Sequence, residues 1–108
     1  MSRAVLASGM GLFVFTAQAV AGENLPYRPG ARHALLVFAT APDAEEAART
    51  AVARVTAEGW LHVDLLRSKA MSQDTGLIAD DTVRAAAESA LSDGCAFIVY
   101  DEPMPPDA

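Results

Sequence analysis

Two segments of the chain repeat apolar residues with the period of an amphipathic α-helix. The first spans residues 44–58, where Asp43 and Glu46 form an acidic capping box before it and Gly59 follows it. Its apolar positions are Ala44, Ala47, Ala48, Ala51, Val52 and Val55. The second segment begins at Asp80 or Asp81 and ends at Asp93-Gly94. Both patterns predict helices that bury one face.

Three further segments have the patterns of β-strands. Residues 34–39 and 95–100 are continuously apolar, which is typical of strands covered on both faces and predicts a central place in the sheet. Residues 60–67 alternate, which predicts a strand nearer an edge. Alternation would place Leu61, Val63 and Leu65 on one face and Trp60, His62 and Asp64 on the other.

The N-terminal part of the chain predicts a further strand. In this account, residues 1–11 are a loose leader, and a strand covers residues 12–21. The loop at residues 22–30 is rich in glycine and proline, and residues 31–41 return as a strand of similar length. The two strands would then form a hairpin.

A competing account takes residues 1–21 as a secretory signal peptide. Arg3 would be its positive end, an apolar stretch would follow, and small residues would precede the cleavage site. The apolar stretch is interrupted by Ser8, Gly9 and Gly11. These interruptions favour the strand. A membrane anchor is a third account, which the polar residues within the stretch weaken.

The predicted order of elements is ββαβαβ, which indicates an α/β chain of α+β-like build. We expect a small two-layer sandwich, with a mixed sheet and both helices on one face. Residues 1–108 would form a single domain that ends in a flexible, acidic, proline-rich tail at residues 101–108. The other sheet face would be bare, and a bare apolar face favours a homodimer.

Composition narrows the range of partners. Eight Lys and Arg residues stand against fourteen Asp and Glu residues, for a net charge of −6, so we expect no nucleic-acid partner and no binding to an anionic membrane. Cys95 is the only cysteine, which excludes an internal disulfide. Abundant alanine and arginine indicate GC-rich codons and hence a bacterial source. The expected location is cytoplasmic, or periplasmic or secreted if residues 1–21 direct export.

The weak candidates for catalysis are His62 and Asp64, which alternation would place beside Trp60 on one face. A carboxylate can orient an imidazole and raise its basicity for proton transfer. Residues two apart on a strand lie about 7 Å from each other, which is too far for a direct hydrogen bond. A solvent-facing strand is therefore the more ordinary interpretation, and we expect no catalytic residues.

Weak candidates for ligand binding are Trp60, His33, Tyr27 and Arg28. His33 opens an apolar strand and could share a metal with His62 and Asp64, but nothing in the spacing requires this, so we predict no metal and no cofactor. Tyr27 and Arg28 lie in the predicted hairpin loop, where binding residues often occur.

No nucleotide-binding or nucleophile motif is present, and the residues point to no particular family. We therefore expect a non-enzymatic protein-interaction module that self-associates, with an unknown protein as a further partner. One alternative is a small-molecule or sensor domain that uses the long polar loop at residues 68–79. Another is an exported accessory protein, which requires residues 1–21 to be a signal peptide.

Overall fold

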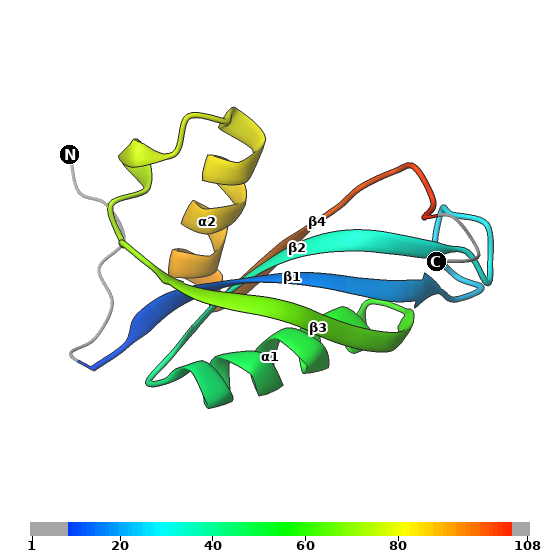
Figure 1. Ribbon diagram of the computed structural model, residues 1–108, viewed down its shortest axis with the longest axis horizontal. Coiled ribbons are helices and arrows are strands. Elements are labelled where there is room, and N and C mark those ends of the chain that lie inside the picture. The colour runs from blue at the N-terminus through cyan, green and yellow to red at the C-terminus, as the bar shows by residue number, and fades with distance from the viewer. Residues whose placement is uncertain (1–8, 105–108) are drawn as a thin grey trace.

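The computed structural model describes residues 9–104, which form one antiparallel sheet and two α-helices (Figure 1). The elements in chain order are β1 (Gly11–Ala21), β2 (Arg32–Ala41), α1 (Ala44–Ala57), β3 (Trp60–Met71), the 3-10 helix η1 (Thr75–Leu77), α2 (Asp81–Asp93) and β4 (Cys95–Val99). The strand order is β3-β1-β2-β4, and every neighbouring pair is antiparallel. The fold is α+β, and the prediction of a mixed sheet is wrong.

Residues 11–21 form β1, which pairs with β2 on one side and with β3 on the other. The strand account therefore describes this segment in the structure, whereas processing as a signal peptide stays a prediction. The first part of the proposed leader, residues 1–8, and the last part of the tail, residues 105–108, lie outside the described residues. None of the helices within residues 9–104 is long and apolar enough to cross a membrane.

The two helices cover opposite faces of the sheet, so the prediction that both lie on one face is wrong. Figure 1 shows α1 along the lower face and α2 above the sheet. Odd-numbered residues of β1 and β2 belong to the cluster under α1, which includes Phe15, Ala17, Leu35 and Val37. Even-numbered residues of β1 and β2 pack against α2. This second cluster contains Leu12 and Phe38 from the strands and Ala87, Ala90 and Leu91 from the helix. Both faces of the central strands are apolar, and burial of both requires a helix on each side.

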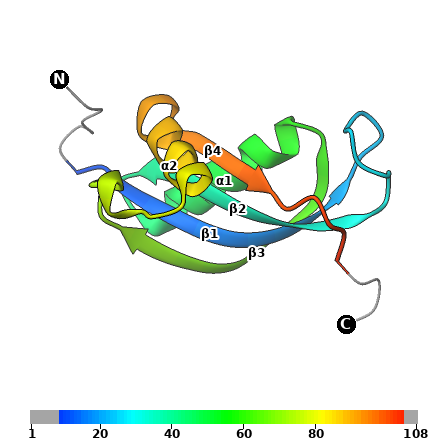
Figure 2. The ribbon, with the colours of Figure 1, turned by 90° about the horizontal axis from the view of Figure 1, so that it is seen from above.

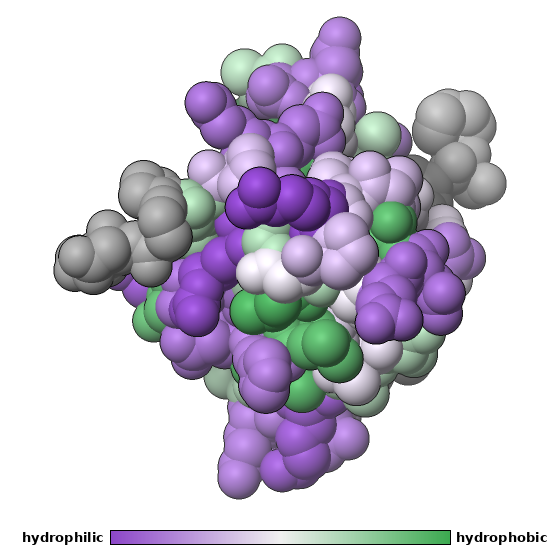
Figure 3. Space-filling model, turned by 90° about the vertical axis from the view of Figure 1, so that its right-hand side faces the viewer, coloured by the Kyte–Doolittle hydropathy of each residue, from purple (hydrophilic) through white to green (hydrophobic). Residues whose placement is uncertain are grey.

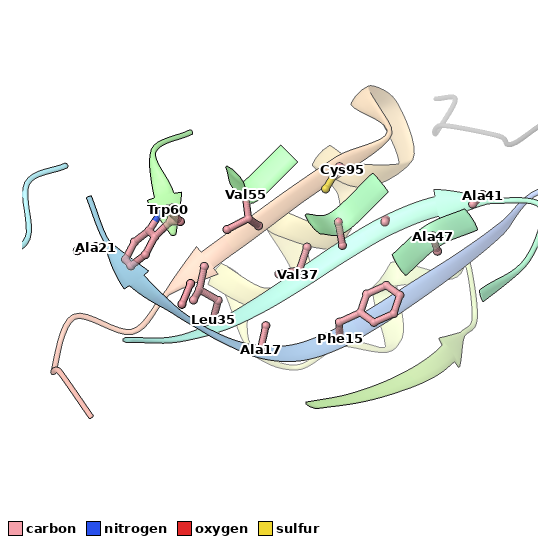
Figure 4. Close-up of a cluster of buried hydrophobic side chains, with 13 residues drawn as sticks. Phe15, Ala17, Ala21, Leu35, Val37, Ala41, Ala47, Val55, Trp60 and Cys95 are labelled. Carbon is pink, nitrogen blue, oxygen red and sulfur yellow. The ribbon is translucent and has the colours of Figure 1, made fainter. Parts of the chain in front are cut away.

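Alanine at the contact surface allows α1 to lie close along the sheet (Figure 4). Its buried residues are Ala47, Ala51 and Val55. The helix begins at Asp43, whose carboxylate accepts a hydrogen bond from the Glu46 N–H at 2.8 Å. Gly59 follows with a φ of 113°, which turns the chain into β3. The predicted roles of Asp43 and Gly59 are thus confirmed, whereas the Glu46 carboxylate accepts a hydrogen bond from Arg49 Nη2.

α2 rises steeply from the other face and covers only one end of it (Figures 1 and 2). The helix begins at Asp80, whose carboxylate accepts from the Val83 N–H at 2.9 Å, and it ends at Gly94 with a φ of 94°. Its fully buried residues are Ala87, Ala90 and Leu91. At one end, the structure therefore has three layers, helix–sheet–helix. At the other end it has the two layers, helix and sheet, that the sequence predicts.

The central strands are β1 and β2, whereas β3 and β4 are the edges. The prediction of a central place for residues 95–100 is therefore wrong. β4 is apolar because α1 and α2 both contact it, one on each face of the sheet. A continuous apolar run indicates that both faces of a strand are buried. It does not indicate whether the strand has a neighbour on each side within the sheet.

Candidate functional site

The predicted trio on β3 is split by a β-bulge. Trp60 pairs with Ala21 and is buried under α1 with 1% of its surface exposed. Asp64 pairs with Gln18, whose side chain points to the opposite face. Between these pairs the register shifts, and His62 adopts a left-handed φ of 52°. Because an extra residue inverts the alternation beyond it, the prediction that Trp60, His62 and Asp64 share a face is wrong.

His62 and Asp64 do not form an acid–base pair. Both residues are exposed, and the Asp64 carboxylate accepts a hydrogen bond from Gln18 Nε2 at 3.3 Å. Within residues 9–104, no hydrogen bond or ion pair joins the His62 ring to a carboxylate. An imidazole that acts as a base needs a partner that fixes its orientation and tautomer. Among the described residues, the His62 ring therefore lacks the carboxylate partner that this hypothesis requires.

His33 is an interior residue in a small aromatic cluster. Its ring centroid lies 4.7 Å from that of Tyr27 and 5.7 Å from that of Trp60, and the Tyr27 and Trp60 rings are 5.5 Å apart. Nδ1 of His33 is 2.8 Å from the Tyr100 carbonyl oxygen. A carbonyl only accepts, so Nδ1 carries the proton and the buried Nε2 has no hydrogen-bond partner. His33 therefore fixes the chain after β4 against the start of β2.

The two predicted histidines are not brought together: His33 is buried, while His62 is exposed on the bulge. Among the described residues, no three His, Cys, Asp or Glu side chains lie close enough together to hold a metal ion.

Tyr27 closes the aromatic cluster from the β1–β2 loop. Its hydroxyl donates a hydrogen bond to Asp101 Oδ1 at 3.3 Å. Burial raises the pKa of Tyr27, and the charge of Asp101 and the hydrogen bond to it raise this pKa further. The chain beyond Asp101 is held as well, because the Met104 N–H donates to the Arg32 carbonyl at 2.7 Å. The described part of the proline-rich tail is thus attached to the sheet.

The loop that carries Tyr27 and Arg28 contacts the turn between α1 and β3. A Cβ on Gly22 would lie 2.4 Å from the Gly59 carbonyl oxygen, so the two backbones meet directly. A Cβ on Gly59 would meet Leu25 at 3.3 Å. Figure 3 shows this end of the molecule, where apolar side chains gather in a small area ringed by polar ones. Arg28 is exposed, and its side chain makes no hydrogen bond or ion pair within the described residues.

The segment at residues 68–79 is not a long patternless loop. β3 continues to Met71, and η1 follows. Thr75 Oγ1 donates to Glu88 Oε2 at 2.9 Å, and Arg84 Nη1 donates to the Ile78 carbonyl at 2.7 Å. These bonds attach Thr75 and Ile78 to α2. The small-molecule alternative that uses this segment stays a prediction.

The part of the sheet that α2 leaves uncovered forms a mixed surface, which we call the open face. It consists of Gln18, Val20, Arg32, Ala34, Leu61, Asp64, Ile98 and Tyr100. Tyr100 belongs to it because its N–H donates to the Ala34 carbonyl at 3.0 Å, one residue beyond β4. Leu61 and Tyr100 are 50% and 48% exposed. This surface lies to the right of α2 in Figure 2.

A groove lies where the open face meets α2. It has a volume of about 380 Å³ and is lined by Val14, Thr16, Leu36, Arg67, Ser68 and Lys69. Sequence reasoning missed it because its residues come from three strands, and only the register brings them together. The one available signal was the spacing of Arg67 and Lys69, which places both cations on one face of a regular strand.

Two of the other hollows offer less chemistry. The larger, of about 830 Å³, follows the outer side of α1 and is lined by Ala48, Arg49, Val52, Ala53, Thr56 and Ala57. The other lies beside Cys95, where Arg54 Nη1 donates to the Cys95 carbonyl at 2.9 Å. Burial raises the pKa of the Cys95 thiol, although the charge of Arg54 opposes this rise. A protonated, buried thiol is a poor nucleophile.

No family model, curated protein or solved structure matches this chain.

Proposed function

We propose that this protein is a non-catalytic interaction module that self-associates through the open face. The observation that supports this function is the incomplete cover of the sheet, because α2 buries one end of its face and leaves the other end exposed. Val20, Leu61, Ile98 and Tyr100 give this end an apolar surface. Contact with a second apolar surface would remove this area from water, which is favourable in proportion to the area buried.

A second copy of the chain is the partner that the charges favour. The chain has a net charge of −6, so most of its surface repels another copy. On the open face, Arg32 and Asp64 balance each other. Two open faces related by a two-fold axis meet without net repulsion, and such an axis places the same patch on both subunits.

The bacterial cytoplasm is the location we propose for this module. β1 lies between β2 and β3, so export with removal of residues 1–21 would leave these two strands without the strand that joins them. This favours a protein that keeps β1 over the exported alternative.

The test is sedimentation velocity over a concentration series, with serine substitutions on and off the open face. We expect a dimer, and we expect Leu61→Ser and Tyr100→Ser each to raise its dissociation constant about tenfold or more, as central apolar contacts do. The two control positions are exposed apolar residues outside the open face. They are Leu77, which is 76% exposed on η1, and Val52, which is 36% exposed on α1. Leu77→Ser and Val52→Ser should leave the dimer unchanged.

Two outcomes would overturn the proposal. The first is a wild-type protein that stays monomeric up to high micromolar concentration. The second is a dimer that is dissociated by Val52→Ser or Leu77→Ser but is unaffected by Leu61→Ser and Tyr100→Ser. Association would then use another surface.

A further inference from the structure

The groove beside α2 has the size and lining of a small-molecule site. Its volume of about 380 Å³ falls within the range of ligand pockets, roughly 300–1,000 Å³. Val14 and Leu36 also contact the buried cluster under α2, so the floor of the groove is fixed by the core. Thr16 is exposed on β1, between Leu36 of β2 and Arg67 of β3. Val14 and Leu36 therefore give the floor of the groove an apolar part that packs against the core.

The rim of the groove is cationic. Arg67 pairs with Thr16 and Lys69 with Val14, so both side chains belong to the face of the sheet that carries the groove. Neither side chain has an ion-pair partner within residues 9–104. By contrast, Arg49 and Arg84 are paired with carboxylates of their own helices. In a chain of net charge −6, two adjacent unpaired cations form a local positive site.

We propose that this groove binds an aliphatic carboxylate, with its head between Arg67 and Lys69 and its chain over Val14 and Leu36. The planar guanidinium of Arg67 is suited to a carboxylate, and Lys69 adds a second positive charge. The exposed parts of Val14 and Leu36 would cover the aliphatic chain of the ligand, which a purely ionic ligand lacks. This inference goes beyond self-association and does not depend on it.

The net charge also limits the class of anion. A polyanion such as nucleic acid would extend past the two cations onto a surface that repels it. A single-headed, short ligand avoids this repulsion, because its only charge lies at the rim. The proposed class is therefore a monocarboxylate with an unbranched apolar chain.

The test is a titration of the ¹⁵N-labelled full chain with octanoate, followed by amide chemical shifts. We expect shifts concentrated at residues 14–16, 36 and 67–69, with a dissociation constant on the order of millimolar, as suits a ligand of this size. Acetate supplies the head alone and 1-octanol the chain alone. Both should bind at least fivefold more weakly than octanoate.

Substitutions separate the groove from general electrostatics. Arg67→Gln and Lys69→Gln should each weaken octanoate binding about fivefold or more. Arg28→Gln removes the same charge from an exposed, unpaired side chain on the β1–β2 loop and should change nothing. Thr16→Tyr should fill the floor and abolish binding, with spectral dispersion as the check that the variant is folded.

Three results would overturn the inference. In the first, octanoate shifts amides across the whole surface, or Arg28→Gln weakens binding as much as Arg67→Gln. In the second, 1-octanol binds as tightly as octanoate, which would make the groove an apolar patch only. In the third, dilution of the protein alone shifts the groove amides and octanoate does not, which would make a second copy the occupant.

Discussion

Trp60 and Asp64 lie four residues apart on β3, yet Trp60 packs beneath α1 and Asp64 pairs with Gln18 on the opposite face. A regular strand would place residues four apart on the same side. The inversion occurs at His62, whose left-handed φ of 52° marks the inserted residue. The bulge lets the strand bury its tryptophan and still present a carboxylate to the uncovered part of the sheet.

The conformation of His62 predicts how substitutions there affect stability. Glycine has no Cβ to oppose a left-handed φ, so His62→Gly should raise the free energy of unfolding by about 0.5–1 kcal/mol. A β-branched residue is strained there, so His62→Val should lower it by about 1–2 kcal/mol. Urea unfolding measures both. Equal stability of the two variants would contradict a left-handed residue at this position.

The close approach of Gly22 and Gly59 predicts a steric effect. A Cβ on Gly22 would lie 2.4 Å from a backbone oxygen, so the loop or the turn must move. Gly22→Ala should therefore lower the free energy of unfolding by about 2 kcal/mol or more. The control is Gly30→Ala, where φ is 86° but no atom lies within 4 Å of the added Cβ. It should lower stability by about 1 kcal/mol, from the backbone conformation alone. A smaller loss at Gly22 than at Gly30 would contradict the contact.

The pKa of Tyr27 should depend on Asp101. Burial is the largest cause of its raised pKa, and the carboxylate adds its charge and a hydrogen bond. Asp101→Asn should therefore lower this pKa part of the way to its ordinary value, because burial remains. An NMR titration of the Tyr27 ring resonances in the wild type and the variant measures the change. An unchanged pKa for Tyr27 would show that the tail does not hold Asp101 against the loop.

Cys95 should make stability depend on alkaline pH. Burial holds the thiol pKa of the folded chain above that of the unfolded chain, so between the two values the folded state keeps a proton that the unfolded state has lost. The stabilisation is complete below the ordinary thiol pKa of about 8.5 and declines as the pH rises above it. Urea unfolding between neutral pH and pH values above this pKa should show a steeper decline for the wild type than for Cys95→Ala. Parallel declines would show that the thiol is exposed.

Local signals predicted the helices well. Asp43, Asp80, Gly59 and Gly94 each act through backbone groups a few residues away, so their effect can be inferred from neighbouring residues alone. The partner of a charged side chain within a helix was harder to infer from the sequence, even at a distance of three or four residues. Helical spacing allows Arg84 to pair with Asp80 or with Asp81. The guanidinium bonds to Asp81, while the Asp80 carboxylate accepts from the Val83 N–H as the helix cap.

The faces of the sheet were not predictable in this way. Whether α2 lies with α1 or opposite it depends on how the chain crosses the sheet, and both faces of β1 and β2 are apolar. The bulge at His62 carries no strong signal either, because histidine is not the residue that a left-handed position favours most. The groove could not be predicted without the faces of the sheet and the bulge. The shared floor beside Arg67 and Lys69 can be recognised only when the register of the three strands is known.

The irregular backbone of β3 also bears on how the molecule avoids fibril growth. An edge strand exposes a row of unpaired N–H and C=O groups, and a long regular edge can recruit the strand of another molecule. β3 is an edge of twelve residues, but two register shifts interrupt its row and Arg67 and Lys69 add charge beside it. The other edge, β4, is only five residues long. Neither edge offers an uninterrupted template, so the self-association proposed above would use the faces of the sheet and end at a finite complex.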